Sequence, residues 1–274
     1  MTRGTPAAVA LAVAGSDPSG GAGIQADLKT FSALGVYGTA VLTALTAQST
    51  RGVTGVHAVP AAFVGDQLRT LLDDVPVGAT KLGMLGTADV VREVAAVLAE
   101  RRPGPVVCDP VMVATSGDRL VGPDTVDAIR ADLLPLTALV TPNVPEAAAL
   151  LDRSPAETVD GMVEQAQALL ELGPGAVLLK GGHLGGAESI DVLVDGGGVV
   201  VTRRPRVTTS STHGTGCTLS SAITALVARG AGGPGEWESV VEQARDYLQE
   251  ALAAGESLGI GSGHGPVHHF VRWW

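Results

Sequence analysis

The chain alternates short apolar runs with amphipathic helical patterns, and this repeat limits the fold more than any other feature of the sequence. The first unit is an apolar run at residues 8–14, a glycine-rich loop, GSDPSGGAG, at residues 15–23 and a helical pattern at residues 24–34. Uninterrupted apolar runs of this length are typical of strands buried on both faces of a parallel sheet. The repeat therefore predicts an α/β fold with a central, mostly parallel sheet covered by helices.

The same unit recurs along the chain. The pattern predicts further strands at residues 38–47, 79–85, 105–108, 138–140 and 177–180, and further helices at residues 60–75, 87–100 and 236–258. Residues 189–202 differ, because they alternate like two antiparallel strands around the glycine turn at residues 195–198. We therefore expect one edge of the sheet to be antiparallel.

Composition restricts the domain organisation and the partners. A chain of 274 residues that is 45% hydrophobic can bury one large core, and no segment has the composition of a linker, so residues 1–274 are predicted to form a single domain. The net charge of −10 argues against a nucleic-acid partner. Cys108 and Cys217 give no disulfide or zinc spacing, and no apolar stretch reaches the roughly 18 residues of a membrane span. These features predict a cytoplasmic protein with no membrane partner.

The motif HGTGC at residues 213–217 leads directly into a helical pattern. Gly214 and Gly216 are expected to adopt positive φ and to let the backbone approach a ligand closely. The free N–H groups of the first helical turn, with the helix dipole, then predict an anion site. Cys217 lies in this turn, so we expect its pKa to fall below the usual value of about 8.5, which makes it a candidate proton acceptor or nucleophile. The alternative is a tight strand-to-helix turn with a small cysteine packed beneath it.

Charged residues follow three of the predicted strands. Asp109 and Glu146 each come after a short apolar strand, and Lys180 ends another. The carboxyl ends of parallel strands meet at one edge of a sheet, so the two carboxylates are expected to converge there, where oxygen ligands suit Mg²⁺ directly or through water. A lysine at that edge is well placed to meet a polyphosphate. For each acid, a helix cap or turn is the alternative.

Gln48 follows the predicted strand at residues 38–47. Its amide offers a donor and an acceptor side by side, which matches the ring nitrogen and amino group of an aminopyrimidine. A solvated loop glutamine is the alternative. Residues 21–26 loosely fit a dinucleotide-binding fingerprint, but the acidic residue expected about twenty positions later is missing. This disfavours an NAD-dependent oxidoreductase, and the sequence also contains no P-loop motif.

Several ordered motifs together are similar to one known family. They are AGSDPSGGAGIQADLKT at residues 14–30, TAQSTRG at 46–52, DPVM at 109–112, TPNVPE at 141–146, KGGH at 180–183, HGTGC at 213–217 and GPVHHF at 265–270. The chain closely resembles the bacterial hydroxymethylpyrimidine/phosphomethylpyrimidine kinases of thiamine biosynthesis, which belong to the ribokinase-like superfamily. The resemblance extends over essentially the whole sequence.

This resemblance implies an ATP- and Mg²⁺-dependent homodimeric kinase with a ribokinase-like three-layer αβα sandwich. It implies two successive phosphorylations of an aminopyrimidine, 4-amino-5-hydroxymethyl-2-methylpyrimidine, first on its alcohol and then on the monophosphate. The residues that it implies around the pyrimidine are Gly15, Asp27, Gln48, Met84 and Val111. Those that it implies around the phosphates are the anion loop Gly214, Thr215, Gly216 and Cys217, with Cys217 as the base, Lys180 beside the nucleotide, and Asp109 and Glu146 near the metal.

Other functions remain open at this stage. A pyridoxine or pyridoxal kinase of the same superfamily would share most of these motifs. A non-catalytic pyrimidine or nucleotide sensor would keep the fold without turnover. A thiolate hydrolase would require a histidine hydrogen-bonded to Cys217, and the only neighbour in the motif is His213.

Overall fold

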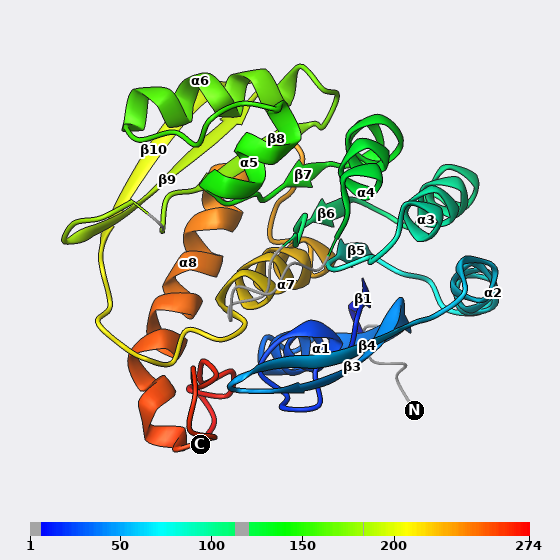
Figure 1. Ribbon diagram of the computed structural model, residues 1–274, viewed down its shortest axis with the longest axis horizontal. Coiled ribbons are helices and arrows are strands. Elements are labelled where there is room, and N and C mark those ends of the chain that lie inside the picture. Colours follow the sequence, from blue (N-terminus) through cyan, green and yellow to red (C-terminus); the bar gives the residue numbers. More distant parts are fainter. Residues whose placement is uncertain (1–6, 113–120, 183) are drawn as a thin grey trace, which may run out of the picture.

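The computed structural model describes residues 7–112, 121–182 and 184–274. The strands of its main sheet are β1 (Val9–Ala14), β2 (Tyr37–Leu42), β5 (Ala79–Leu82), β6 (Val106–Cys108), β7 (Leu139–Val140), β8 (Ala176–Lys180), β9 (Glu188–Asp195) and β10 (Gly198–Pro205). Within the described residues they form an eight-stranded sheet in the order β10-β9-β8-β7-β6-β5-β1-β2 (Figure 1). The strands from β8 to β2 are parallel, whereas β9 and β10 are antiparallel. The predicted sheet and its antiparallel edge are confirmed.

Helices cover both faces of this sheet (Figure 1). One layer contains α1 (Gly23–Ala33), α7 (Thr215–Ala228) and α8 (Trp237–Ala254), with a 3₁₀ turn at Gly255–Leu258. The other contains α2 (Ala61–Leu72), α3 (Ala88–Arg101), α4 (Pro123–Ala128), α5 (Val144–Leu151) and α6 (Val159–Leu170), with a π-helical turn at Ile129–Leu133 and a 3₁₀ turn at Leu134–Leu136. The three-layer αβα sandwich predicted from the sequence is therefore confirmed.

Strand β1 shows how the sequence divides the two layers. Leu11 and Val13 face the layer of α2 to α6, whereas the alternating alanines Ala10, Ala12 and Ala14 face the layer of α1, α7 and α8. Side chains of a strand point alternately to opposite faces, so one strand can present large residues on one side and small residues on the other. The small side leaves room for α7 to lie close to the sheet.

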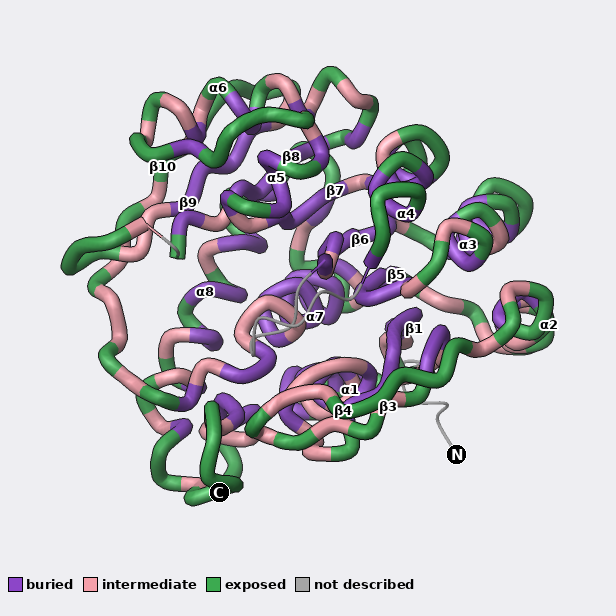
Figure 2. The backbone as a smooth tube through the Cα atoms, viewed as in Figure 1, coloured by how far each residue is buried: buried purple, intermediate pink, exposed green. Residues whose placement is uncertain are grey.

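Helix α7 is buried on every side between Thr218 and Val227. It packs against the sheet while α1 and α8 flank it, and Figure 2 shows most of its length coloured as buried and its first turn as intermediate. A helix that is buried all round does not need a polar face, and its serines and threonines instead make internal hydrogen bonds. The core therefore fixes the position of the helix whose first turn carries the predicted anion loop.

The strand predicted at residues 38–47 is divided into two strands in different sheets. Strand β2 ends at Leu42, and β3 (Ala44–Ser49) pairs with β4 (Gly52–Ala58) in a separate two-stranded antiparallel sheet. The chain turns at Thr43, whose hydroxyl donates to the Met84 carbonyl at 2.7 Å. No glycine or proline marks this change of sheet in the sequence. The continuous apolar pattern was therefore interpreted as a single strand. Gln48 was predicted at the end of a strand of the central sheet. It instead lies within β3 of the two-stranded sheet, so this prediction was wrong.

Most other boundaries agree with the prediction to within a few residues. The predicted strand at residues 79–85 ends earlier, at Leu82, because Gly83 begins the loop toward α3. Thr87 was predicted inside a helix and instead caps α3, since its side chain accepts a hydrogen bond from the Val90 amide. Among the helices of the described ranges, none is both long enough and apolar enough to span a membrane.

Truncation of Ile223 in α7 tests how far this core holds the fold. The side chain is 0% exposed, so Ile223→Ala is expected to lower the free energy of unfolding by about 2–5 kcal/mol. Ile260→Ala is the matched control, because Ile260 is 48% exposed, and it should change the unfolding free energy by less than about 0.5 kcal/mol. Urea unfolding of both variants measures the difference, and equal losses would contradict the central position of α7.

Candidate active site

A cavity of about 950 Å³ lies at the carboxyl ends of the parallel strands. The β1–α1 loop, strand β3, the first turn of α7 and part of α8 form its walls. All but one of the residues that the sequence predicted for the site line it: Gly15, Gln48, Met84, Asp109, Val111, Glu146, Lys180, Gly214, Thr215, Gly216 and Cys217. The exception is Asp27. The fold therefore brings residues from widely separated motifs into one concave site.

Gly214 and Gly216 serve different purposes in the anion loop. Gly214 precedes α7 with φ 76°, as expected, and a Cβ there would lie 1.7 Å from the Gly21 carbonyl oxygen. Gly216 lies within the first turn of α7 and does not adopt positive φ, so that expectation was wrong. A Cβ on Gly216 would lie 3.3 Å from Asp109 Oδ2 and 3.4 Å from Lys180 Nζ. Gly216 is thus the point where the anion loop approaches these two charges.

Asp109 and Lys180 form an ion pair beneath the anion loop. Lys180 Nζ lies 2.7 Å from Asp109 Oδ1, and the side chains are only 14% and 2% exposed. Burial acts to lower the pKa of Lys180, but the charges of Asp109 and Glu146 outweigh it, so the pKa is raised. Lys180 therefore remains positively charged at the cavity wall, where it can meet an anionic ligand.

Glu146 caps a helix, which was the alternative considered for it, and it also lines the cavity. Its side chain accepts a hydrogen bond from the Asn143 amide at 2.8 Å, and Asn143 caps the Glu146 amide in return at 2.9 Å, which forms the capping box of α5. Burial raises the pKa of Glu146 to about 7, although the positive charge of Lys180 acts in the opposite direction. The carboxyl group consequently titrates near neutral pH.

Cys217 does not have the lowered pKa that the sequence predicted. Cys217 lines the cavity and is partly exposed there. Burial of the thiol nevertheless raises its pKa to about 11, although the positive charge of Lys81 acts to lower it. The prediction weighed the helix N-terminus and omitted desolvation, which penalises the anionic form. In the protein without ligands, the Cys217 side chain is therefore a neutral thiol at pH 7.

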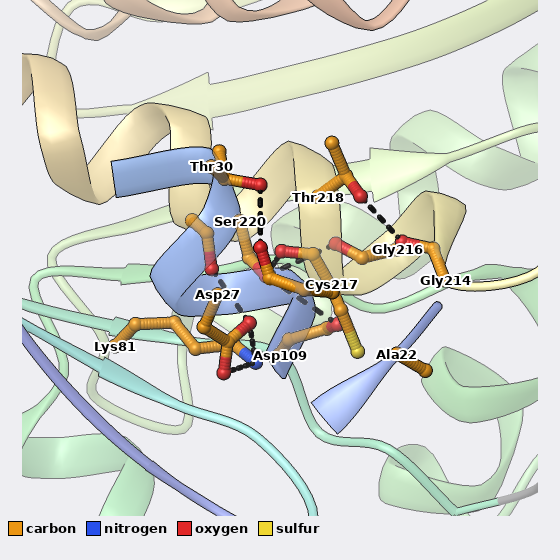
Figure 3. Close-up of polar contacts among 12 residues, drawn as sticks. Ala22, Asp27, Thr30, Lys81, Asp109, Gly214, Gly216, Cys217, Thr218 and Ser220 are labelled. Carbon is orange, nitrogen blue, oxygen red and sulfur yellow. Dashed lines mark hydrogen bonds and ion pairs between the residues drawn. The ribbon is translucent and has the colours of Figure 1, made fainter. Parts of the chain in front are cut away.

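Asp27 lies behind the cavity and pairs with Lys81. Lys81 Nζ contacts both carboxylate oxygens of Asp27, at 2.8 and 2.9 Å, and both side chains are 0% exposed (Figure 3). Ser221 of α7 donates a third hydrogen bond to Asp27, at 2.7 Å. The structure thus places Asp27 as a partner of Lys81 that joins α1, β5 and α7. This position does not match the expected substrate contact.

Sequence reasoning missed Lys81, Asp17 and Thr46, all of which border the cavity. A signal was present for Lys81, because a lysine interrupts the buried strand ATKL. Asp17 lies in a glycine-rich loop where acids are common, and Thr46 lies in a strand whose partner was not predicted. His213 was considered only as a partner for Cys217, but its ring nitrogen Nε2 lies 2.7 Å from Asp17 Oδ2.

This arrangement defines the protein as a ribokinase-like kinase, in which a glycine loop at a helix N-terminus faces a strand-end lysine across one cavity. The family model described as phosphomethylpyrimidine kinase matches residues 17–268. The chain belongs to the phosphomethylpyrimidine kinase family.

Individual relatives agree with this assignment. The chain is 51% identical to the hydroxymethylpyrimidine/phosphomethylpyrimidine kinase of Escherichia coli, over 97% of this chain and 98% of that protein. The structure of the Staphylococcus aureus pyridoxal kinase in complex with AMP-PCP and pyridoxal has a TM-score of 0.88 and 32% identity, covering 98% of this chain and 96% of that one. The phosphomethylpyrimidine kinase of Clostridium difficile has a TM-score of 0.78 and 40% identity, covering 89% and 98%.

Removal of the Lys81 charge tests whether the buried pair supports the site. Lys81→Met leaves the Asp27 carboxylate buried without a partner charge, so the unfolding free energy is expected to fall by about 3–5 kcal/mol. The double variant Lys81→Met/Asp27→Leu removes both charges and should recover most of this loss. Thermal and urea unfolding measure both variants.

The control is the exposed pair of Arg203 and Glu188, whose side chains are 49% and 53% exposed. Arg203→Met is expected to cost less than about 1 kcal/mol. If Lys81→Met cost no more than this control, the buried pair would have no structural role of the kind described.

Proposed function

We propose that this protein is an ATP-dependent kinase that phosphorylates 4-amino-5-hydroxymethyl-2-methylpyrimidine and then phosphorylates the monophosphate to the diphosphate, in thiamine biosynthesis. The observation that carries the proposal is the closeness of the anion loop, at Gly216, to Asp109 and Lys180 in the cavity that Gln48 also lines. The 51% identity to the E. coli kinase of this name over nearly the whole chain supports it further.

We assign Gln48, Gly15, Met84 and Val111, which all line the cavity, to the pyrimidine end of the site. The amide of Gln48 is suited to the amino group and adjacent ring nitrogen of the substrate, and the apolar side chains are suited to its ring faces. A Cβ on Gly15 would lie 2.4 Å from Met84 Cε, so any side chain there would displace Met84 from the cavity wall. Glycine at this position therefore leaves Met84 in its place at the cavity wall.

We assign Lys180 and the anion loop Gly214 to Cys217, which line the same cavity, to the phosphate end of the site. The first-turn N–H groups of α7 and the Lys180 ammonium would hold the γ-phosphoryl group of ATP and offset its charge. The complexes of the S. aureus kinase include the ATP analogue AMP-PCP, which supports a nucleotide at this cavity. Placement and electrostatics would then supply most of the rate, as in other phosphoryl transfers.

Asp109 and Glu146 fit the requirements of Mg²⁺. Both are buried carboxylates at the cavity, and among the described residues no cluster of three or more His, Cys, Asp or Glu side chains could hold a metal alone. Mg²⁺ in kinases uses one or two protein carboxylates and takes its other ligands from phosphates and water. When bound, it would neutralise phosphate charge.

The two transfers make different demands on the protein. In the first, the substrate hydroxyl oxygen attacks the γ-phosphorus, the bond to ADP breaks, and the hydroxyl proton must leave. We assign the thiolate form of Cys217, which is the minor form at pH 7 because the pKa is raised to about 11, as the acceptor of this proton. In the second transfer, the nucleophile is a phosphate monoester with a second pKa near 6, which is already anionic at neutral pH and needs no base.

Turnover by the purified protein tests the proposed function. With ATP, Mg²⁺ and the hydroxymethyl aminopyrimidine, we expect the monophosphate to form first and the diphosphate to follow, as resolved by chromatography. If the protein bound the pyrimidine and ATP without forming either product, a sensor would be the better description.

Replacement of Cys217 tests its role as a base. Cys217→Ala is expected to slow the first transfer by roughly 10²- to 10³-fold while the second changes only a few-fold. Since the thiol has a pKa of about 11, the thiolate fraction increases with pH, and the first transfer of the wild type should accelerate between about pH 7 and 10. The second transfer should not follow this profile.

Cys108→Ala is the control for Cys217→Ala, because Cys108 is buried in β6 and does not line the cavity. It should leave the pH profiles of both transfers unchanged. Equal losses in the two transfers for Cys217→Ala would argue against a base and for a structural contribution to the anion loop.

Pyridoxal phosphorylation is the second candidate, because the structure matches the S. aureus pyridoxal kinase with a TM-score of 0.88. Direct competition between pyridoxal and the hydroxymethyl aminopyrimidine, expressed as the ratio of kcat/KM, distinguishes the two. We expect the aminopyrimidine to be preferred, since the relatives of about 50% identity are named for it.

The proposal extends to organisation. We assign residues 1–274 to one kinase domain that acts as a cytoplasmic homodimer. Leu45 of β3 and Val56 of β4 are 48% and 55% exposed, which supports a contact surface on the two-stranded sheet. Analytical ultracentrifugation tests the oligomeric state.

A further inference from the structure

Two glycine-rich loops from distant parts of the chain are joined by one buried side-chain contact. Asp17 lies in the β1–α1 loop and His213 directly precedes the anion loop, and His213 Nε2 lies 2.7 Å from Asp17 Oδ2. The side chains are 1% and 6% exposed. The contact therefore lies inside the protein, at the edge of the cavity that both residues line.

Asp17 is held firmly by its own loop. Its carboxylate accepts hydrogen bonds from the Ser19 amide at 2.9 Å, the Ala22 amide at 2.7 Å and the Ser19 hydroxyl at 2.7 Å. Burial acts to raise the pKa of Asp17, but the bonds from His213 and Ser19 outweigh it and lower the pKa to about 2. Asp17 is consequently a fixed negative charge at any pH at which the protein would work.

The backbones of the two loops also lie in direct contact. A Cβ on Gly21 would lie 2.4 Å from the His213 ring, and a Cβ on Gly214 would lie 1.7 Å from the Gly21 carbonyl oxygen. Neither glycine can be replaced without moving one loop away from the other. The distance between the loops is thus set by close packing together with the bond between Asp17 and His213.

Each loop holds one partner of the proposed reaction. The β1–α1 loop carries Gly15 at the pyrimidine end and continues to Gln48 through hydrogen bonds: the Thr46 hydroxyl lies 2.8 Å from the Ser16 carbonyl and 3.2 Å from Gln48 Oε1. The loop after His213 carries the anion site. A continuous set of contacts therefore connects the acceptor end with the phosphoryl end of the cavity.

We propose that Asp17 and His213 are positioning residues, which fix the distance between the substrate hydroxyl group and the transferred phosphoryl group. This inference rests on the function proposed above for the two loops. Positioning residues of this kind act on the reactive geometry more than on binding, because each substrate can still occupy its own half of the cavity. Loss of the contact should therefore lower kcat and leave the two binding affinities nearly unchanged.

A role for His213 as the base partner of Cys217 is a different explanation, and the geometry does not support it. The ring bonds Asp17, and Ser19 Oγ lies 3.5 Å from the same nitrogen. No hydrogen bond joins His213 to Cys217, although the structure describes both residues. The thiolate hydrolase considered from the sequence lacks the contact that it requires.

The test compares His213→Leu with His213→Gln, whose side-chain amide can place an N–H near the position of Nε2. We expect His213→Leu to slow both transfers by a similar factor, roughly 10²-fold, since small misplacements of reacting groups cost about that much. Dissociation constants for the aminopyrimidine and AMP-PCP, measured by calorimetry, should change less than about 3-fold. More of the ATP consumed should be hydrolysed to ADP and phosphate without product. His213→Gln should restore most of the rate and the coupling.

His268→Leu is the matched control. His268 is buried to a similar degree, at 6% exposed, but it does not line the cavity, and its Nδ1 atom has no hydrogen-bond partner within the described residues. This variant should keep wild-type kcat and coupling. Asp17→Asn changes the other partner of the contact and should show the same coupling defect. It therefore provides the test if His213→Leu does not fold.

The outcomes separate the alternatives. Unchanged kcat in His213→Leu and Asp17→Asn, with normal wild-type turnover, would overturn the positioning role alone. Loss confined to the first transfer would indicate a proton-transfer role and would overturn the positioning role. Weaker binding with an intact kcat would overturn it too, and so would a His213→Gln variant that is no faster than His213→Leu. If the wild type transferred phosphate to neither substrate, the proposed function would fail and this inference with it.

Discussion

Burial of paired charges under the first turns of α7 is the constraint on which the rest of this site depends. Lys81 with Asp27 and Lys180 with Asp109 place two ammonium groups and two carboxylates at the carboxyl edge of the sheet, with little or no exposure to solvent. Each charge is costly to bury alone and is tolerated because its partner lies within hydrogen-bonding distance. The pairs keep lysine charges permanently beside a helix N-terminus, so the edge of the sheet is prepared for an anion before any ligand arrives.

The same burial determines the acid–base character of the site. It raises the pKa of Glu146 to about 7 and of Cys217 to about 11, although Lys180 and Lys81 respectively act against these shifts. A low-dielectric environment strengthens the interactions of fixed charges with an anion, and it also disfavours an isolated thiolate. The burial that pairs these charges therefore also lowers the fraction of Cys217 that is present as thiolate at neutral pH. Under the proposed role of Cys217, the first transfer needs the thiolate and the second does not, so one cavity would serve two transfers of different chemical demand.

Local patterns in the sequence predicted the sheet, its antiparallel edge and the glycine loop, acids and lysine that line part of the cavity, because strand ends and glycine turns are encoded by neighbours in the chain. Gly15, Met84 and Val111 were assigned to the site by the family resemblance. Properties set by distant residues could not be predicted. The division between β2 and β3 depends on Thr43 bonding to Met84, and the position of Asp27 depends on Lys81 and on Ser221 of α7. The predicted lowering of the Cys217 pKa was wrong for the same reason. The effect of a helix N-terminus can be inferred from neighbouring residues, whereas desolvation of the thiol depends on the whole fold.

The C-terminal segment shows how far these long-range contacts extend. The His213 amide donates to the Gly265 carbonyl at 3.0 Å, and the His264 amide donates to the Thr50 carbonyl at 2.9 Å. One short segment thus holds both the anion loop and the turn of the two-stranded sheet that carries Gln48. Two parts of the cavity wall that are far apart in the sequence are therefore linked through the same C-terminal segment. The relation between the anion loop and the strand that carries Gln48 is consequently set by contacts across the fold, because no single motif contains both.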